Sequence, residues 1–111
     1  MSKKIGPTPC PSDCPVRMTA DILEHKWATL IIRDLLEGKK RFSELEKSLN
    51  PISPKILSQR LRELEHLQIV TRTIFPTVPP TTEYTLTPLG QELRAVIQAM
   101  SQFGSLLMKT D

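Results

Sequence analysis

Four polar side chains recur at a spacing that places them on one side of a helix, and their types suit hydrogen bonding to nucleic-acid bases. Lys55, Ser58, Gln59 and Arg62 follow one another at steps of three, one and three residues. Lys and Arg can donate to guanine O6 and N7, and Gln can pair with adenine through two hydrogen bonds. The pattern predicts a base-reading helix face, although the solvated face of an ordinary surface helix has the same spacing.

The other side of this segment is apolar, and its first residues favour helix initiation. Four leucines recur at steps of four, three and three, which predicts a single buried stripe: Leu57, Leu61, Leu64 and Leu67. Ser53 is a good N-cap, and Pro54 suits the first helical position. Because recognition helices usually meet base edges at their N-terminal ends, we include Ser53 in the predicted reading face.

Positive side chains lie before and after this helix. Lys39, Lys40 and Arg41 precede a predicted short helix and form a candidate phosphate clamp with its N-terminus, although most charge runs are solvated loops. Arg72 is a candidate backbone contact from the strand that follows. Arg60 lies off the reading stripe, and the sequence leaves open whether it contacts a phosphate or a nearby acid.

Cys14 is the candidate for thiol chemistry. A cysteine reacts as the thiolate, which a helix N-terminus or a nearby cation favours. Cys14 comes just before a predicted helix that carries Arg17, and Cys10 could act as a resolving thiol. An inert cysteine is the alternative.

Patterns typical of enzymes are missing from the sequence. Four glycines form no phosphate-binding loop, and the two histidines and two cysteines have no CxxC or HxxxH spacing. We therefore expect no catalytic site, no metal and no cofactor.

The elements that would hold these residues can be read along the chain. Residues 16–37 show helical periodicity, and Gly38 is expected to end the helix. The sequence leaves open whether His25 and Lys26 break this region into two helices. Ser43 and Glu46 suggest a capping box that opens a short helix. The next elements are a turn, the helix at 53–67, and a proline-tipped hairpin over 69–75 and 83–86. Together they predict a winged helix-turn-helix, which is mainly α with a small β-hairpin wing. Tyr84 is expected to pack the wing onto the domain.

Thr87 and Pro88 predict the start of a last helix over about residues 87–108, which we assign to dimerisation. Its apolar residues alternate at steps of four and three: Leu89, Leu93, Val96, Met100, Phe103 and Leu107. This seam favours pairing with a second copy over packing within the domain, and Trp27 is expected to be a core or interface anchor.

Composition limits the class of protein. The 111 residues suit one domain, with a predicted flexible arm at 1–15 and the winged domain at 16–111. The net charge of +3 is concentrated before residue 76, which fits a nucleic-acid partner. The sequence shows neither a bilayer-spanning run nor a signal-peptide pattern, so we expect a cytoplasmic protein with no membrane partner and with reduced cysteines.

Most of the chain resembles the HxlR-type transcriptional regulators. The matching segments include ISPKILSQRLRELE at 52–65 and EYTLTPLG at 83–90, with shorter matches at 14–16, 26–36, 41–45 and 78–80. The resemblance implies a homodimeric winged-helix fold related to MarR-type regulators, which binds double-stranded operator DNA and pairs through its first and last helices. It also implies that Cys14 matches a position at which several members sense small electrophiles or oxidants.

Two positions depart from the family pattern. The family commonly has an Arg after the paired wing prolines, where this chain has Thr81, and often a Trp in the last helix, where it has Phe103 and Gly104. Gly costs about 1 kcal/mol of helix stability relative to Ala, so we expect the helix to fray or bend there. The predicted function is a sequence-specific DNA-binding transcriptional regulator, and a protein-interaction module of the same fold is the alternative.

Overall fold

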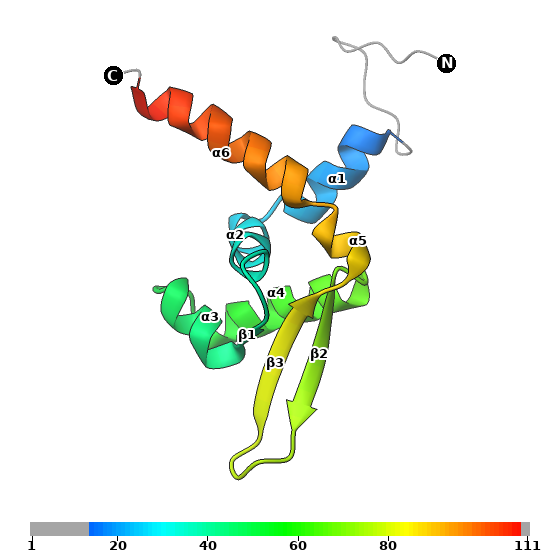
Figure 1. Cartoon of the computed structure of the whole chain (residues 1–111), viewed down its shortest axis with the longest axis vertical. Coiled ribbons are helices and arrows are strands. Elements are labelled where there is room, and N and C mark those ends of the chain that lie inside the picture. The colour runs from blue at the N-terminus through cyan, green and yellow to red at the C-terminus, as the bar shows by residue number, and fades with distance from the viewer. Residues whose placement is uncertain (1–13, 110–111) are drawn as a thin grey trace.

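The computed structural model describes residues 14–109 and has a mainly helical fold with one small sheet (Figure 1). In chain order the elements are α1 (Pro15–Leu23), α2 (Lys26–Leu35), β1 (Lys40–Arg41), α3 (Phe42–Ser48), α4 (Pro54–His66), β2 (Val70–Phe75), β3 (Thr81–Leu86), α5 (Pro88–Gln91) and α6 (Arg94–Lys109). This confirms the predicted winged helix-turn-helix. Most of the predicted arm over residues 1–15, including Cys10, lies outside the described residues.

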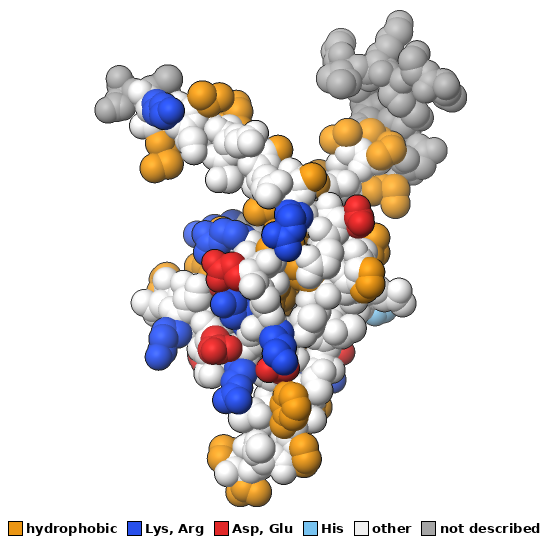
Figure 2. Space-filling view, in the orientation of Figure 1, with side chains coloured by type: hydrophobic (Ala, Val, Ile, Leu, Met, Phe, Trp, Pro, Cys, Tyr) orange, Lys and Arg blue, Asp and Glu red, His pale blue; other side chains and the backbone are white. Residues whose placement is uncertain are grey.

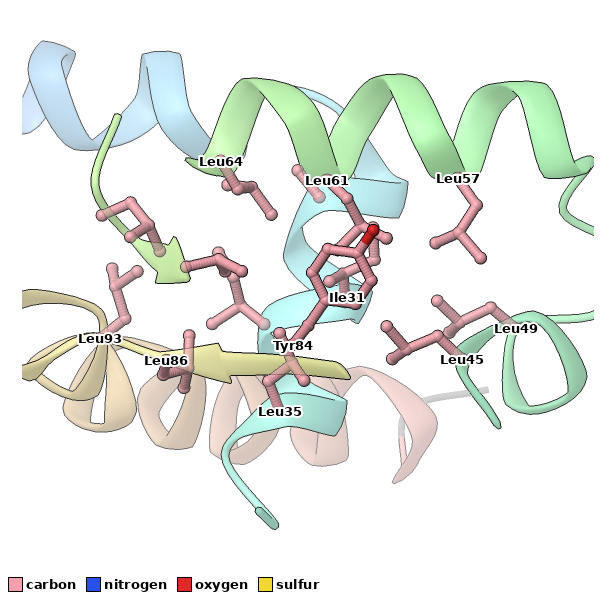
Figure 3. Packing of buried hydrophobic residues seen from close by; sticks show 14 of the residues in the cluster. Ile31, Leu35, Leu45, Leu49, Leu57, Leu61, Leu64, Tyr84, Leu86 and Leu93 are labelled. Carbon is pink, nitrogen blue, oxygen red and sulfur yellow. The ribbon is translucent and has the colours of Figure 1, made fainter. Parts of the chain in front are cut away.

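The core forms where α2 crosses α4 and the base of the sheet (Figure 3). Ile31, Ile32 and Leu35 of α2 are almost completely buried, and so are the first three leucines of the predicted stripe on α4. Leu67, the fourth, is 46% exposed, so its assignment to the buried stripe is wrong. The physical reason is that α4 ends at His66 and the chain turns sharply at Gln68, which has a φ of 62°.

The helical region before Gly38 is two helices, which answers the question that the sequence left open. α1 ends at Leu23, and the Thr29 hydroxyl of α2 donates to the Leu23 carbonyl oxygen at 3.1 Å. This buried contact fixes the corner between the helices. Gly38 has a φ of 144°, a conformation that favours glycine, and it ends the segment as predicted.

The two helices of the helix-turn-helix, α3 and α4, have different N-terminal caps. The sequence predicted the cap of α4 correctly but not that of α3. The Ser53 hydroxyl accepts a hydrogen bond from the Ile56 N–H at 3.1 Å, as expected for the N-cap of α4. The predicted capping box of Ser43 and Glu46 is wrong, because α3 begins at Phe42 and the Glu44 carboxylate accepts from the Arg41 N–H at 2.8 Å. Arg41 is already extended there by strand pairing, so the helix starts directly after the strand.

The sheet has three antiparallel strands in the order β1-β3-β2. β2 and β3 form the predicted hairpin, with Val70 opposite Leu86 at the buried base and Phe75 opposite Thr81 near the tip. β1 was not predicted, because a strand of two residues has no sequence pattern of its own and forms only by pairing with Tyr84 and Glu83 of β3. It brings the Lys39–Arg41 segment alongside the wing.

A buried carboxylate ties α2 to α3. Asp34 is 5% exposed, accepts from the Ser48 hydroxyl at 2.6 Å, and forms an ion pair with Arg33 at 3.0 Å. Such a group costs free energy if its hydrogen bonds are removed, so it fixes the position of α3. The sequence pattern did not indicate this contact.

The predicted single helix over 87–108 is wrong, because it breaks between Gln91 and Arg94 into α5 and α6. The Thr87 hydroxyl caps α5 by accepting from the Gly90 N–H at 3.0 Å, and it also donates to the Gln68 carbonyl oxygen at 2.6 Å. Gly90 lies so close to the Ile69 carbonyl oxygen that a Cβ would overlap it. These contacts hold α5 against the turn that follows α4, while α6 leaves in a new direction.

The outer helices α1 and α6 project from the body (Figure 1). None of their residues is fully buried. α6 continues through Gly104 to Lys109, so the expected fraying at Gly104 is not observed.

Candidate nucleic-acid interface

The outward face of α4 carries the predicted base-reading residues. Lys55, Gln59 and Arg62 are exposed, whereas Ser58 is half-buried. They share this face because the leucine stripe turns the opposite side of α4 into the core. Ser53 lies at the start of the same helix, where its hydroxyl accepts the capping hydrogen bond and can still donate its own proton.

The wing lies beside α4 and is joined to it by an ion pair. Arg72 of β2 approaches Glu65 of α4, with 3.7 Å between Nε and Oε2. Both side chains remain partly exposed, at 47% and 35%. Arg72, predicted as a backbone contact, therefore lies at the junction of helix and wing with an acid beside it, which the sequence did not reveal.

Tyr84 packs beneath this junction. It is paired with Arg72 across the hairpin and is 7% exposed, which agrees with the expectation that it packs the wing onto the domain. Burial is the main cause that raises the pKa of the Tyr84 phenol above its ordinary value; Arg72 lowers it, Glu65 raises it and Arg62 lowers it. The phenol therefore stays neutral at physiological pH while responding to three charges of the candidate interface.

The cations before α3 also have acidic neighbours. Lys40 approaches Glu37 with 3.2 Å between Nζ and Oε1, and Lys39 approaches Glu83 at 3.8 Å. Arg41 is exposed at the N-cap of α3. The three cations form a group along the loop and β1 edge of the body, and Figure 2 shows cations with interspersed acids on this face.

Arg60 lies away from the reading face. It is 14% exposed and forms two hydrogen bonds from Nη1 to the Glu63 carboxylate, at 2.9 and 3.0 Å. The sequence left open whether Arg60 contacts a phosphate or a nearby acid. In the structure it pairs with the acid Glu63.

Cys14 is the N-cap residue of α1 and is half-buried. Its extended backbone leads directly into Pro15, the first helical residue, and Arg17 follows in the first turn. The positive end of the helix dipole favours a thiolate there. The predicted setting of a cysteine at a helix N-terminus is thus present.

The candidate dimer residues fall into two groups. Phe103 and Leu107 are 62% and 61% exposed, Met100 is 47% exposed and Leu89 is 58% exposed, while Val96 is half-buried. Leu93, which lies in the break between α5 and α6, is 8% exposed in the domain's own core, so its assignment to a dimer seam is wrong. Trp27 packs at the edge of the core, with Lys26 Nζ 4.8 Å from its ring centre.

An apolar groove separates α1 from α6. Val16, Leu23, Val96 and Met100 are among its lining residues. Figure 2 shows hydrophobic side chains gathered on both projecting helices. This surface extends from the groove along the exposed side of α6.

Two other kinds of site were sought in the described part of the chain. Between residues 14 and 109, no group of three His, Cys, Asp or Glu side chains is arranged to hold a metal ion. Over the same range, every helix is too short or too polar to span a bilayer.

Comparisons with known proteins agree with this geometry. A family model described as HxlR-like helix-turn-helix matches residues 22–111. The HTH-type transcriptional regulator sll1512 of Synechocystis is 40% identical over 92 residues, which cover 83% of this chain and 68% of the relative.

Solved structures show the same fold. A regulator of the MarR family from Porphyromonas gingivalis W83 matches with a TM-score of 0.84 at 33% identity, covering 98% of this chain and 100% of the other. The redox regulator HypR in its reduced form matches with a TM-score of 0.81 at 35% identity, covering 86% and 94%. The chain therefore belongs to the HxlR-like helix-turn-helix family of transcriptional regulators.

Proposed function

We propose that this chain acts as a homodimer that binds operator DNA in a sequence-specific manner, without catalysis. The observation that carries the proposal is the exposed face of α4, where Lys55, Gln59 and Arg62 project beside a wing whose Arg72 pairs with Glu65 of the same helix. Lys55, Gln59 and Arg62 would contact base edges in the major groove, with Ser53 and Ser58 at the start and flank of the same helix. Lys39, Lys40, Arg41 and Arg72 would contact phosphates.

Dimerisation would supply the second half-site. α6 has 16 residues, about 24 Å of helix, and exposes a nearly continuous apolar side. Exposed apolar surface on a projecting helix is unfavourable in water, and a second copy offers a matching surface. Two reading helices placed about 34 Å apart would then enter successive major grooves on one side of the DNA.

A thiol response is proposed for Cys14. Attack of its thiolate on hydrogen peroxide would give a sulfenic acid and hydroxide, and attack on an electrophile would give a covalent adduct. HypR, a relative described as a redox regulator, is known in reduced and oxidised forms. A modified Cys14 would press on the α1–α6 groove and alter the spacing of the two reading helices.

The reading face is tested by replacing its cations. Lys55→Ala and Arg62→Ala should each weaken binding to a cognate palindrome, selected from a random duplex pool, by about 1–3 kcal/mol, because each removes a base contact. Binding to random duplex should fall much less. Fluorescence anisotropy measures both affinities.

Lys109→Ala is the matched control, since it removes one positive charge at the far end of α6 (Figure 1). Equal losses for all three variants would mean that charge alone matters. No loss for Lys55→Ala and Arg62→Ala would refute the assigned reading face.

The ion pair between wing and helix makes a second prediction. Glu65→Gln should leave Arg72 free to contact a phosphate, so duplex affinity should rise and the slope of log K against log salt should steepen by about 0.9. In an Arg72→Ala background the same substitution should have little effect. The test is a double-mutant cycle, in which salt titrations of DNA binding compare the wild type, Glu65→Gln, Arg72→Ala and the double variant.

Glu63→Gln serves as the control for simple loss of negative charge on α4, because Glu63 pairs with Arg60 instead. If Glu65→Gln and Glu63→Gln had the same effect in both backgrounds, Arg72 would not be the phosphate contact.

The proposed dimer surface is tested at its exposed aromatic. Phe103→Asp should convert the protein to monomers at micromolar concentration and weaken palindrome binding at least tenfold, because a buried unpaired charge is costly. Sedimentation velocity measures the assembly state. Gln102→Asp, one residue away in the same exposed helix, should remain dimeric, and a wild-type chain that is monomeric with and without duplex would contradict the proposal.

The proposed thiol response predicts that wild type and Cys14→Ser differ in duplex affinity only after treatment with an oxidant or electrophile. Cys14→Ser should bind duplex like the reduced wild type, and peroxide or a quinone should change the affinity of the wild type alone. Mass spectrometry of the treated protein locates the modification. An equal response of both proteins would remove Cys14 from the mechanism.

A further inference from the structure

A hollow with a volume of about 650 Å³ lies between the end of α1 and the C-terminal half of α4. This volume is in the range of sites that hold small molecules. Gln59 and Arg62, two of the proposed base-reading residues, form part of its wall. A molecule bound in this hollow would therefore share side chains with the proposed DNA-binding surface.

The wall that comes from α1 attracts positive charge. Asp21 lies in the last turn of α1 and Glu24 is its C-cap residue, and both are exposed side chains that line the hollow. The C-terminal end of a helix carries partial negative charge, and the last turn of α1 has no basic residue to offset it. Two carboxyl groups at this end are unfavourable for the helix by itself, and an ammonium group bound beside them would reduce the repulsion.

The wall that comes from α4 carries the complementary group. Its residues follow one another at steps of three, one, three and one, which places them on one stripe of the helix: Gln59, Arg62, Glu63, His66 and Leu67. The planar guanidinium of Arg62 suits a carboxylate, and the Gln59 amide can donate to the same group. Glu63 already accepts two hydrogen bonds from Arg60. The α4 wall therefore offers donors to an anion.

The opposite charges of the two walls are not paired with each other. Among the ion pairs within residues 14–109, Glu24 is joined to His25 at 3.8 Å and Glu63 to Arg60 at 2.9 Å, whereas Asp21 and Arg62 take part in none. Asp21 and Arg62 thus line one hollow from two helices without a salt bridge between them. A molecule that carries both charges fits this arrangement.

Leu67 adds an apolar contact to the same hollow. It directly follows α4, is 46% exposed and lines the hollow beside the polar groups. An aliphatic or aromatic group placed against Leu67 would remove apolar surface from water, which is favourable.

We propose that this hollow binds a small zwitterion with an apolar side group, such as an α-amino acid, and that the bound molecule competes with operator DNA. Its ammonium group meets Asp21 and Glu24, its carboxylate meets Arg62, and its side group covers Leu67. Because the carboxylate occupies the guanidinium that would contact a base, the ligand and the operator weaken each other's binding by the same factor. The competition rests on the proposed function, whereas binding of the zwitterion to the free protein does not.

Three probes with the same ring separate the two charges. L-Phenylalanine carries both, phenethylamine lacks the carboxylate, and phenylpropionate lacks the ammonium group. Titrated into the protein without DNA and followed by amide chemical shifts, phenylalanine should bind about tenfold more tightly than either fragment, since each fragment loses one charge-assisted contact. The zwitterion site would be overturned if a fragment bound as tightly as phenylalanine, or if neither phenylalanine nor L-leucine bound.

Substitutions in the two walls assign each charge to its partner. Asp21→Asn should weaken binding of phenylalanine and phenethylamine about tenfold and leave phenylpropionate unchanged, and Arg62→Gln should weaken phenylalanine and phenylpropionate instead. Asp21 is exposed, so its substitution should not affect folding. Glu92→Gln is the control, because Glu92 is an exposed acid in the break between α5 and α6. A loss of the same size in Glu92→Gln would mean that only overall charge matters, which contradicts the site.

The competition is measured by fluorescence anisotropy with the selected palindrome and with random duplex. Saturating phenylalanine should lower the affinity of the wild type for the palindrome about tenfold and change its affinity for random duplex much less. Asp21→Asn should bind the palindrome without ligand and should lose this response. Palindrome affinity that is unchanged when phenylalanine is bound would overturn the competition. If phenylalanine binding depends on Asp21 and Arg62 but the wild type prefers no palindrome over random DNA, the site is supported and the proposed function fails.

Discussion

The burial of one leucine stripe on α4 determines how the rest of this molecule is arranged. Leu57, Leu61 and Leu64 pack against Ile31 and Leu35 of α2, and burying each leucine stabilises the fold by about 1.5–3 kcal/mol. A helix held along one side must present its other side outward. The orientation of the polar face therefore follows from core packing, and residues of α3 and of the base of the wing pack into the same cluster (Figure 3).

Several of the cations around the candidate interface lie in partly exposed pairs with acids. Three cations near the candidate interface each have an acid within 4 Å, in the pairs Lys39–Glu83, Lys40–Glu37 and Arg72–Glu65. Exposed pairs of this kind contribute little to stability, so exchanging a carboxylate for a phosphate costs little. The positive charge of Lys39, Lys40 and Arg72 is therefore partly offset by neighbouring acids.

Local signals allowed much of this fold to be predicted, and long-range contacts explain what was missed. Ser53 before Pro54 and Thr87 before Pro88 mark helix starts through interactions within four residues, and both caps are present. β1, the Asp34–Ser48 hydrogen bond and the Arg72–Glu65 pair join segments whose proximity depends on the whole fold. Leu93 has the right spacing for a seam on an unbroken helix, but the helix is interrupted between Gln91 and Arg94, and Leu93 is buried in the domain's own core.

The Thr87 hydroxyl joins α5 to the turn that follows α4. Thr87 accepts from Gly90 in α5 and donates to Gln68, the left-handed residue that follows α4, while Arg94 at the start of α6 donates to the Leu36 carbonyl oxygen at 3.2 Å. The corner between α5 and α6 is thus attached at two points to the body that carries the reading helix. Movement of α6 relative to the rest of the domain would therefore have to break, or carry along, hydrogen bonds to the residues that follow α4 and α2.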